Sequence, residues 1–417
     1  MGRRKVRYLA VTGVFFYLIA VANDRVAMYA LSVGLFSLLL VAYALARITA
    51  HGLSAVRGGG LTVTRITAGQ PLPTGLRLTN LGSLPKSGLL LTDRVVNTVR
   101  DERREETVLV GNLAGEATLP VTFDHPPARR GVAVLGPTFI TAGDPLGLFE
   151  VQRELPGTRG EVLVHPRLSE LPMSASAALD GADSSRSRRA ASGFDLHGLR
   201  EYVSGDDPRH VHWRASARRG RLMVKEFEQP SDRELVVLLD LQQRQVFGAG
   251  DVSSLEAAIS AAGSLAAFQA RSGRTVRLVA HEGQRLEWRV TAGAHLPLAL
   301  LDGLARVRGI GQVSAVSLLR QSLDRLRPGG ALVMVTAAAE AELLGELRAL
   351  AEKGRDVQLI LLDAAAFAAV EGRALPDWCL PLTAVGRFLY GDGVRLTVLG
   401  PGADLLGALA DGLKGVA

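Results

Sequence analysis

Two long uncharged segments open the chain. Tyr8 to Asn23 contains no charged residue over 16 positions, and Val26 to Ala46 contains none over 21. At 1.5 Å per residue, the second segment is long enough to cross a hydrocarbon core of about 30 Å. The first is slightly short, but Arg7 can extend it by snorkelling. We therefore predict two transmembrane helices, at about 8–23 and 26–46, within a membrane part formed by residues 1–50.

The charges around these segments predict their orientation. Only Asn23, Asp24 and Arg25 separate them, so the helices should form a hairpin with both ends on one side. Basic residues flank the pair at Arg3, Arg4, Lys5, Arg7, Arg47 and Arg57. The positive-inside rule then places both ends and the soluble body in the cytoplasm, in a multi-pass protein of the plasma membrane. The alternative is a signal peptide cleaved after Ala20-Val21-Ala22, which would leave the second segment as an anchor.

The next part alternates between apolar and polar residues with a period of two. Short runs of this kind are separated by Gly, Pro and Asn, and they cover 61–66, 76–80, 89–92, 106–110, 117–123 and 132–135. This pattern is typical of antiparallel strands and predicts a β-sandwich-like domain over 55–170. His125 precedes Pro126-Pro127 and is expected to lie in a loop. The pattern contains no catalytic constellation.

A stretch rich in Ser, Ala, Asp and Arg follows at 171–193 and predicts a flexible linker. It ends in the basic cluster Ser184–Arg189. Such a cluster could bind nucleic acid or anionic lipid, but no stacking aromatic residues are interleaved with it. A solvated linker is the preferred interpretation, and no nucleic-acid partner is expected.

Residues 230–417 alternate between apolar runs and amphipathic segments, which indicates a doubly wound α/β domain. The predicted strands are 235–240, 275–281, 331–336, 357–363 and 396–399, and the predicted helices are 254–270, 296–307, 314–326, 339–353 and 403–413. Ligands of such sheets bind at the carboxyl ends of the strands, which makes Asp240 the first candidate position. Gly309-Ile310-Gly311 lacks the preceding strand of a nucleotide-binding motif, and no phosphate-binding P-loop occurs.

Composition narrows the possible classes of protein. The net charge is +7, from 48 basic and 41 acidic residues, and only five of the basic residues are Lys. This net positive charge is small for a protein with a nucleic-acid-binding surface. The single cysteine, Cys379, excludes a disulfide framework and a cysteine-based zinc site. No cofactor is expected.

Segment 194–229 has the most unusual composition. Asp195, His197, Asp206, Asp207, His210 and His212 could be metal ligands, since on a strand His210 and His212 would share a face. The competing interpretation is structural. Gly205 to Pro208 resembles a turn, and Trp213 is expected to be a buried anchor. Bidentate ion pairs would fix the segment against a neighbouring domain through Glu201, Arg209, Arg214, Arg218 and Arg219. We prefer the structural interpretation, because no ligand spacing here is diagnostic.

The same segment carries a resemblance to a known family. Arg200-Glu201-Tyr202, Gly205-Asp206-Asp207-Pro208-Arg209 and His212-Trp213-Arg214-Ala215-Ser216-Ala217-Arg218 closely resemble the signature of the bacterial "domain of unknown function 58" family. The match continues to Lys225-Glu226, and Arg130-Gly131, Leu135-Gly136-Pro137 and Asp144 to Phe149 are similar to members upstream. We expect a structural and docking role for Arg200, Glu201, Tyr202, Gly205, Asp206, Asp207, Arg209, His212, Trp213, Arg214, Ser216, Arg218, Lys225 and Glu226.

The resemblance also implies a C-terminal domain similar to von Willebrand factor A. That fold holds Mg²⁺ through an Asp-x-Ser-x-Ser loop, and here Asp240 is present while Gln242 and Arg244 replace the two serines. Arg244 would bring a positive charge to the position of the cation, and the later strand ends in Val335-Thr336-Ala337 without an Asp. We therefore expect the fold without the metal, with Asp240 pairing with Arg244 or capping the following helix.

Two classes of function remain. The resemblance implies partners such as a MoxR-type AAA+ ATPase and a membrane transglutaminase-like protein. It therefore favours a non-enzymatic membrane adaptor in envelope or protein-complex assembly. The alternative is a metal-dependent hydrolase that uses the Asp and His residues of 194–229. The adaptor also accounts for the membrane hairpin and the degenerate metal loop, whereas the hydrolase accounts only for the clustered Asp and His residues.

Overall fold

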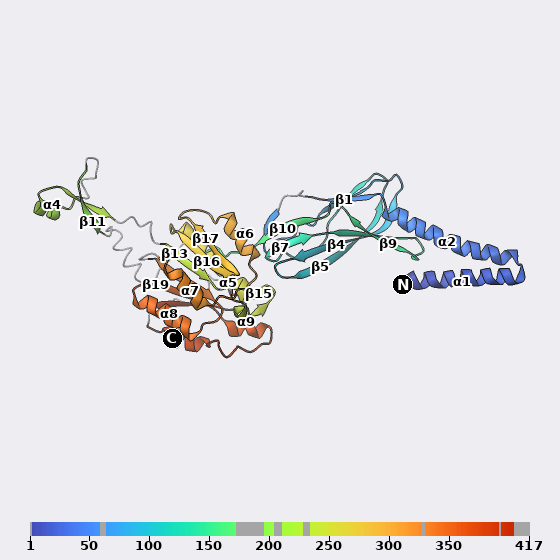
Figure 1. Cartoon of the computed structure of the whole chain (residues 1–417). Coiled ribbons are helices and arrows are strands. Elements are labelled where there is room, and N and C mark those ends of the chain that lie inside the picture. The colour runs from blue at the N-terminus through green and yellow to red at the C-terminus, as the bar shows by residue number, and fades with distance from the viewer. Residues whose placement is uncertain are drawn as a thin grey trace. The chain divides into compact units, whose positions relative to one another are not determined.

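The computed structural model describes residues 2–58, 64–171, 196–203, 211–227, 234–326, 330–391 and 393–403 of the chain. The chain divides into two compact units, Met1–His165 and Pro166–Ala417, each of which is described by itself (Figure 1). Three predictions fall wholly or mostly outside the described residues. They are the start of the strand at 61–66, nearly all of the linker 171–193, and the final helix at 403–413.

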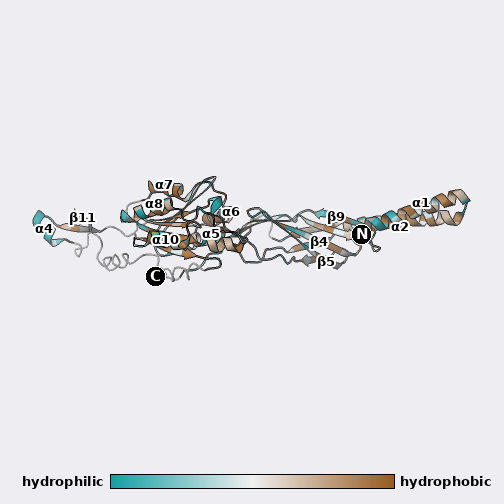
Figure 2. Cartoon of the chain, turned by 90° about the horizontal axis from the view of Figure 1, so that it is seen from below, coloured by the Kyte–Doolittle hydropathy of each residue, from teal (hydrophilic) through white to brown (hydrophobic). Residues whose placement is uncertain are grey.

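The predicted helical hairpin is confirmed. Helices α1 (Gly2–Asn23) and α2 (Val26–Ala50) are unbroken and antiparallel (Figure 1), and both are long and apolar enough to cross a membrane. Their residues are predominantly hydrophobic (Figure 2). Ser32 Oγ donates a hydrogen bond to Gly13 O at 2.9 Å, and a Cβ on Gly13 would lie 3.1 Å from the Phe36 ring. A small residue at this position therefore lets the two helices approach closely.

The rest of the first unit is built from strands. These are β1 (Leu53–Arg57), β2 (Thr64–Thr67), β3 (Leu76–Asn80), β4 (Lys86–Asn97), β5 (Glu102–Leu113), β6 (Thr118–Val121), β7 (Gly131–Leu135), β8 (Thr138–Gly143), β9 (Glu150–Leu155) and β10 (Gly160–His165). They form a three-stranded sheet in the order β1-β3-β6 and a seven-stranded sheet in the order β2-β10-β7-β4-β8-β9, with β5 paired to β4. The inward residues of both sheets, such as Leu78 and Leu89, share one apolar core.

The sequence pattern located β3 at its observed bounds but missed β1, β8, β9 and β10. Strand β9 explains why. Its sequence, EVQREL, is mostly charged and polar because all of its residues except Leu155 remain at least partly exposed. A strand with so little buried surface carries a weak apolar signal, and its existence depends on pairing with β8.

The second unit contains the predicted alternation of strands and helices. Its main sheet has β13 (Leu235–Leu239), β16 (Val276–Glu282), β17 (Gln284–Val290), β18 (Ala331–Thr336), β19 (Asp356–Leu362) and β20 (Val394–Leu399). Its helices are α5 (Ser254–Arg271), α6 (Leu298–Arg306), α7 (Ala315–Leu323), α8 (Ala341–Glu352), α9 (Ala364–Val370) and α10 (Leu382–Leu389), with a minor β14–β15 hairpin (Gly248–Ala249, Val252–Ser253). The prediction omitted α9, α10 and β17, the edge strand that runs antiparallel to β16.

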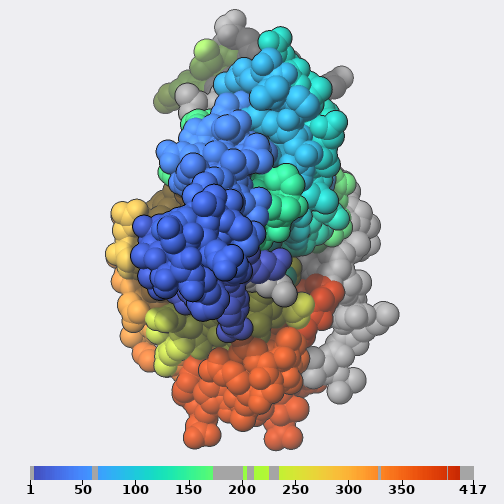
Figure 3. Space-filling model, turned by 90° about the vertical axis from the view of Figure 1, so that its right-hand side faces the viewer, coloured from blue at the N-terminus to red at the C-terminus, as the bar shows by residue number. Residues whose placement is uncertain are grey.

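Helices cover both faces of this sheet (Figure 1). Leu235, Val237 and Leu239 of β13 pack with α5, α6 and α9, whereas Val236 and Leu238 pack with α7, α8 and α10. A strand buried on both faces is continuously apolar, which is why its sequence was easy to recognise. In Figure 3 the orange to red elements from β18 onward form one continuous region of the surface.

The start of this unit is attached to α5. Ser260 Oγ donates a hydrogen bond to Arg167 O at 2.7 Å, and Ser169 N donates one to Ser264 Oγ at 2.8 Å. Gly263 lies between these two serines, and a Cβ there would lie 2.6 Å from Leu168 Cδ2. The glycine therefore provides the space in which the segment packs on the helix.

Candidate functional site

The strand order places Asp240 and Thr336 at the crevice where ligands of doubly wound sheets bind. The order is β17-β16-β13-β18-β19-β20, so the chain starts in the middle of the sheet, moves to one edge and then returns to the other side. The reversal occurs between β13 and β18. Asp240 directly follows β13, and Thr336 is the last residue of β18. In sheets of this kind the opening beyond these carboxyl ends is the usual ligand position.

Asp240 is buried and is bound by the protein itself. Its Oδ1 accepts a hydrogen bond from Gln242 N at 2.9 Å, and its Oδ2 accepts one from Thr336 Oγ1 at 2.8 Å. Burial raises the pKa of Asp240 to about 6, and these two hydrogen bonds offset only part of that effect. Both carboxylate oxygens therefore have protein partners in this conformation.

Arg244 does not pair with Asp240, and this expectation was wrong. Arg244 Nε donates to Gln242 Oε1 at 3.0 Å, and its terminal nitrogen forms an ion pair with Glu340, which precedes α8. The guanidinium carbon also lies 4.6 Å from the centre of the Trp378 ring. The alternative that Asp240 caps a helix is also wrong, because its side chain bonds Gln242 and Thr336 instead.

The glycines at 309–311 form part of the same edge of the sheet. Gly311 N donates to Leu241 O at 2.8 Å, and Gln243 N donates to Gly311 O at 2.9 Å. The carboxylate of Glu282 accepts hydrogen bonds from the backbone N–H groups of Arg308, Gly309 and Ile310. An internal carboxylate therefore occupies the donors that an anionic ligand would need, and it holds this loop against the end of β13.

The signature segment forms a small separate structure. Strands β11 (Leu196–Glu201) and β12 (Met223–Phe227) pair in an antiparallel manner, and helix α4 (Trp213–Arg219) lies between them in the sequence. Tyr202 N extends the ladder by donating to Leu222 O at 2.9 Å. In the register, Arg200 faces Val224, and Lys225 and Glu226 face Leu199 and Gly198. Gly205, Asp206, Asp207 and Arg209 lie outside the described residues.

His212 and Ser216 hold α4 on this hairpin. His212 Nδ1 accepts a hydrogen bond from Ala215 N at 3.1 Å and thus caps the helix, which begins at Trp213. Buried Ser216 donates to His212 O at 3.1 Å and accepts from Met223 N at 2.8 Å. These two signature residues therefore have structural roles. The prediction that His212 would share a strand face with His210 was wrong for His212, while His210 lies outside the described residues.

Trp213 is 68% exposed, so the prediction of a buried anchor was wrong. At 100° per residue, Trp213, Ala217, Arg214 and Arg218 occupy one continuous face of α4 that does not include Ser216, and all four are exposed. We call these four residues the α4 face. Glu201 forms an ion pair with Arg221 at 3.3 Å. Arg209 lies outside the described residues.

The proposed metal ligands do not gather in the part of the chain that the structure describes. There, no group of three or more His, Cys, Asp and Glu side chains could hold a metal ion. Asp195, Asp206, Asp207 and His210 lie outside that part.

A buried polar cluster in the first unit escaped the sequence analysis. Asp93 Oδ1 accepts hydrogen bonds from Arg57 and from Thr138 Oγ1, both at 2.6 Å, and Oδ2 lies 3.5 Å from His125 Nε2. Burial alone would raise the pKa of Asp93, but the contacts with His125, Thr138 and Arg57 bring it below its usual value. His125 lies in a loop, as predicted, yet its side chain is buried. These residues are far apart in the sequence, so no local spacing could reveal the cluster.

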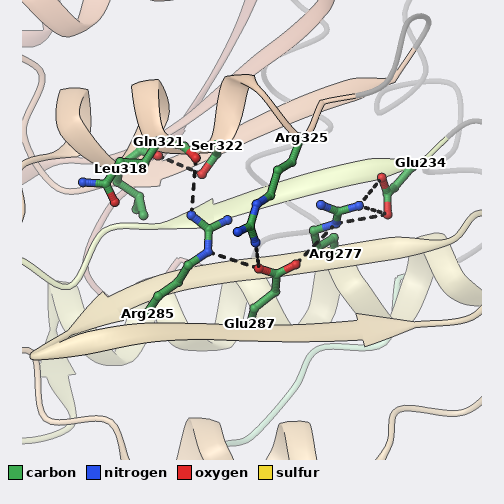
Figure 4. Close-up of polar contacts among 8 residues, drawn as sticks. All are labelled: Glu234, Arg277, Arg285, Glu287, Leu318, Gln321, Ser322 and Arg325. Carbon is green, nitrogen blue, oxygen red and sulfur yellow. Dashed lines mark hydrogen bonds and ion pairs between the residues drawn. The ribbon is translucent and has the colours of Figure 1, made fainter.

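A second charged cluster lies on strands β16 and β17 and helix α7 (Figure 4). Arg277 binds both carboxylate oxygens of Glu234 at 2.8 Å. Glu287 of β17 is bound at 3.1 Å by Arg285 and by Arg325, which follows α7. These ion pairs tie the antiparallel edge strand to the neighbouring strand and helix, which indicates a structural role.

Comparisons with known proteins give a family match and several similar solved structures. Residues 198–365 match the family described as "Protein of unknown function DUF58". No curated protein matches the chain. One solved structure is the conserved hypothetical protein BatB from Bacteroides thetaiotaomicron, with 12% identity over 43% of this chain and 97% of that one, and a TM-score of 0.31. Another is an aerotolerance-related membrane protein from Bacteroides fragilis NCTC 9343 with multiple mutations to serines, with 14% identity over 43% and 96%, and a TM-score of 0.29.

The family match includes the last strand positions of β11, helix α4 and the sheet as far as the start of α9. It therefore covers both the α4 face and the crevice at Asp240. The sequence signature that starts at Arg200 lies within it. Residues 198–365 of the chain thus match the DUF58 family, in agreement with the resemblance of the signature.

Proposed function

We propose that this chain is a membrane-anchored, non-enzymatic interaction protein whose α4 face docks a protein partner. The observation that carries the proposal is the exposure of Trp213 beside Arg214 and Arg218. Trp and Arg are the residues most enriched among the energetic centres of protein interfaces. A large aromatic side chain left 68% exposed on a short helix is available for burial by a partner.

The supporting hairpin suits such a role. His212 and Ser216 fix the inner side of α4, so the α4 face is held in one orientation before a partner arrives. Preorganisation of this kind lowers the entropic cost of binding. Neither Arg214 nor Arg218 is seen in an ion pair with an acidic side chain among the described residues. Both side chains are exposed, and their charge would suit an acidic partner surface.

The wider arrangement that we propose follows the family resemblance. Both ends of the hairpin and both units lie in the cytoplasm, and the partner is a MoxR-type AAA+ ATPase acting in envelope or protein-complex assembly. A membrane transglutaminase-like protein belongs to the same assembly. The first unit is a β-sandwich, the second is similar to von Willebrand factor A, and the chain has the five parts 1–50, 55–170, 171–193, 194–229 and 230–417.

A pull-down with matched variants tests the proposal. The full chain in detergent would be immobilised and incubated with a MoxR-type ATPase from the same genome, with and without ATP. Trp213→Ala should weaken binding by about thirtyfold, the equivalent of an interface centre worth about 2 kcal/mol. Tyr390→Ala, which removes an aromatic side chain that is 82% exposed directly after α10, is the control and should leave binding unchanged.

Two results would contradict the docking role. Equal binding by the wild type and by Trp213→Ala would remove the α4 face from the interface. Loss of a cellular phenotype in Trp213→Ala, with melting and partner binding both at the wild-type level, would require a catalytic role for the signature segment instead.

A further inference from the structure

We propose that Arg244, stacked on Trp378, is a binding site for a carboxylate of a protein partner, and that Glu340 occupies this site in the free protein. The partner segment would be acidic with an apolar neighbour. The proposal concerns the carboxyl edge of the main sheet and does not depend on the α4 face. The two can therefore fail separately.

The geometry of Arg244 is that of a prepared anion receptor. The Trp378 ring lies 4.6 Å below the guanidinium carbon, and Gln242 Oε1 accepts from Nε at 3.0 Å. These two contacts fix the plane of the guanidinium group and do not involve the edge formed by its two terminal nitrogens. A guanidinium has five N–H donors, and among the described residues acceptors are seen only for Nε and for one terminal nitrogen. The remaining donors can take both oxygens of a carboxylate.

Glu340 is suited to leave this site. The side chains of Arg244 and Glu340 are 40% and 30% exposed, so their ion pair is in contact with solvent. Solvent-exposed ion pairs contribute little to stability, and an incoming carboxylate replaces one such pair with another of the same kind. The side chain of Glu340 makes no capping hydrogen bond to α8, although it stands at the N-cap position. Its displacement would therefore leave the helix intact.

A cavity beside the pair suggests what accompanies the carboxylate. It has a volume of about 200 Å³ and lies between the ends of β18 and β19, lined mainly by Ala, Leu and Pro side chains. Ala339 and Cys379 are part of its wall, and they adjoin Glu340 and Trp378 in the chain. Leu380 N donates to Ala339 O at 3.2 Å, which joins the two loops. A cavity of this lining accepts an aliphatic side chain rather than a phosphate or a sugar.

None of the residues that line the cavity is Lys, Arg or His. Burial raises the pKa of the Cys379 thiol to about 11, so this group is neutral at physiological pH. The carboxylate of Asp363 accepts from Ala366 N at 3.1 Å and caps α9. Arg244 is therefore the positive group that would attract an acidic segment to this cavity, and the cavity selects the apolar residue next to the acid.

The test uses two short peptides and the indole signals of the full chain. Acetyl-Glu-Leu-amide and its neutral counterpart acetyl-Gln-Leu-amide would be titrated into the detergent-solubilised protein with ¹⁵N-labelled tryptophan. The loss of one indole N–H signal in Trp378→Phe identifies the resonance of Trp378. We expect a saturable shift of that signal with the Glu peptide and not with the Gln peptide.

Three variants test whether the peptide carboxylate binds to Arg244 in place of Glu340. Arg244→Gln should abolish the shift, and Glu340→Gln should bind the Glu peptide up to about fivefold more tightly, because the competing carboxylate is removed. Arg320→Gln, which breaks an exposed ion pair with Glu346, is the matched control and should behave as the wild type. Equal binding of both peptides, binding that persists in Arg244→Gln, or no shift in either the wild type or Glu340→Gln at millimolar peptide would overturn the proposal.

Discussion

Replacement of Asp240 with Asn should stabilise the second unit at neutral pH. Asp240 is 6% exposed, and burial is the main reason why its pKa is raised. An amide fits the same hydrogen bonds. Its oxygen can accept from Gln242 N, and its nitrogen can donate to Thr336 Oγ1, which in turn donates to Ala338 O at 3.2 Å. The variant therefore removes a buried charge without leaving a polar group unpaired.

The magnitude follows from the pKa of Asp240. Its value rises from 3.8 in the unfolded chain to about 6 in the folded protein, a difference that corresponds to about 3 kcal/mol. Because the folded form holds its proton more tightly, the carboxyl group costs nothing below about pH 4. That cost grows between about pH 4 and 6, and above that range it is fully present. The advantage of Asp240→Asn should therefore be near zero at about pH 4 and about 3 kcal/mol at about pH 7.5.

Thermal unfolding of the full chain in detergent measures this difference. For a unit of this size, each kcal/mol shifts the melting temperature by about 2–4 °C. The shift between variant and wild type should shrink as the pH is lowered towards 4. Asp377→Asn, at an exposed position, is the control and should melt with the wild type. If Asp240→Asn melts earlier than the wild type at neutral pH, the charged carboxylate is stabilising, and the account of this crevice is wrong.

Three further predictions concern topology, metal binding and packing. A reporter fused after Ala417 should be active only as a cytoplasmic reporter, and an active periplasmic reporter would refute the proposed orientation. Magnesium should not raise the melting temperature, because both Asp240 oxygens have protein partners. A bound ligand at a hundredfold excess over its dissociation constant would stabilise by about 2.7 kcal/mol, and a rise of this size that disappears in Asp240→Ala would contradict the prediction. Gly303→Ala should lower the melting temperature, because the new Cβ would lie 2.4 Å from the Trp288 ring, whereas Gly345→Ala, with no atom within 4 Å, should raise it through helix propensity.

Long apolar segments and continuously apolar strands could be predicted from the sequence. The two hairpin helices depend only on the length and hydropathy of the local sequence, and the observed helices contain the predicted ones. Strand β18 was predicted at its exact bounds, since all its residues but the first are buried and apolar or small. Asp240 was identified as a candidate ligand position because it is a charged residue directly after an apolar strand. In each case the signal lies within one element.

Elements that carry both polar and apolar residues could be identified only from the tertiary structure. Strand β17 has the polar sequence QRLEWRV, and it belongs to the sheet because it pairs along its length with β16. The wrong prediction for Trp213 has a similar origin. A large aromatic residue is usually buried, but α4 packs on its hairpin through Ser216 and leaves Trp213 uncovered.

The sequence by itself determined which residues stand at the critical positions, and only the tertiary structure decided their partners. Together with the family resemblance, the residues Asp240, Gln242 and Arg244 led to the prediction of a degenerate metal loop. That Asp240 bonds Thr336, 96 residues away, and that Arg244 turns to Glu340 and Trp378, depends on where three separate loops meet. Hydropathy and turn chemistry act over a few neighbouring residues and are therefore visible in a sequence. Hydrogen bonds and ion pairs between distant residues exist only once the strands have set the register that brings those residues together.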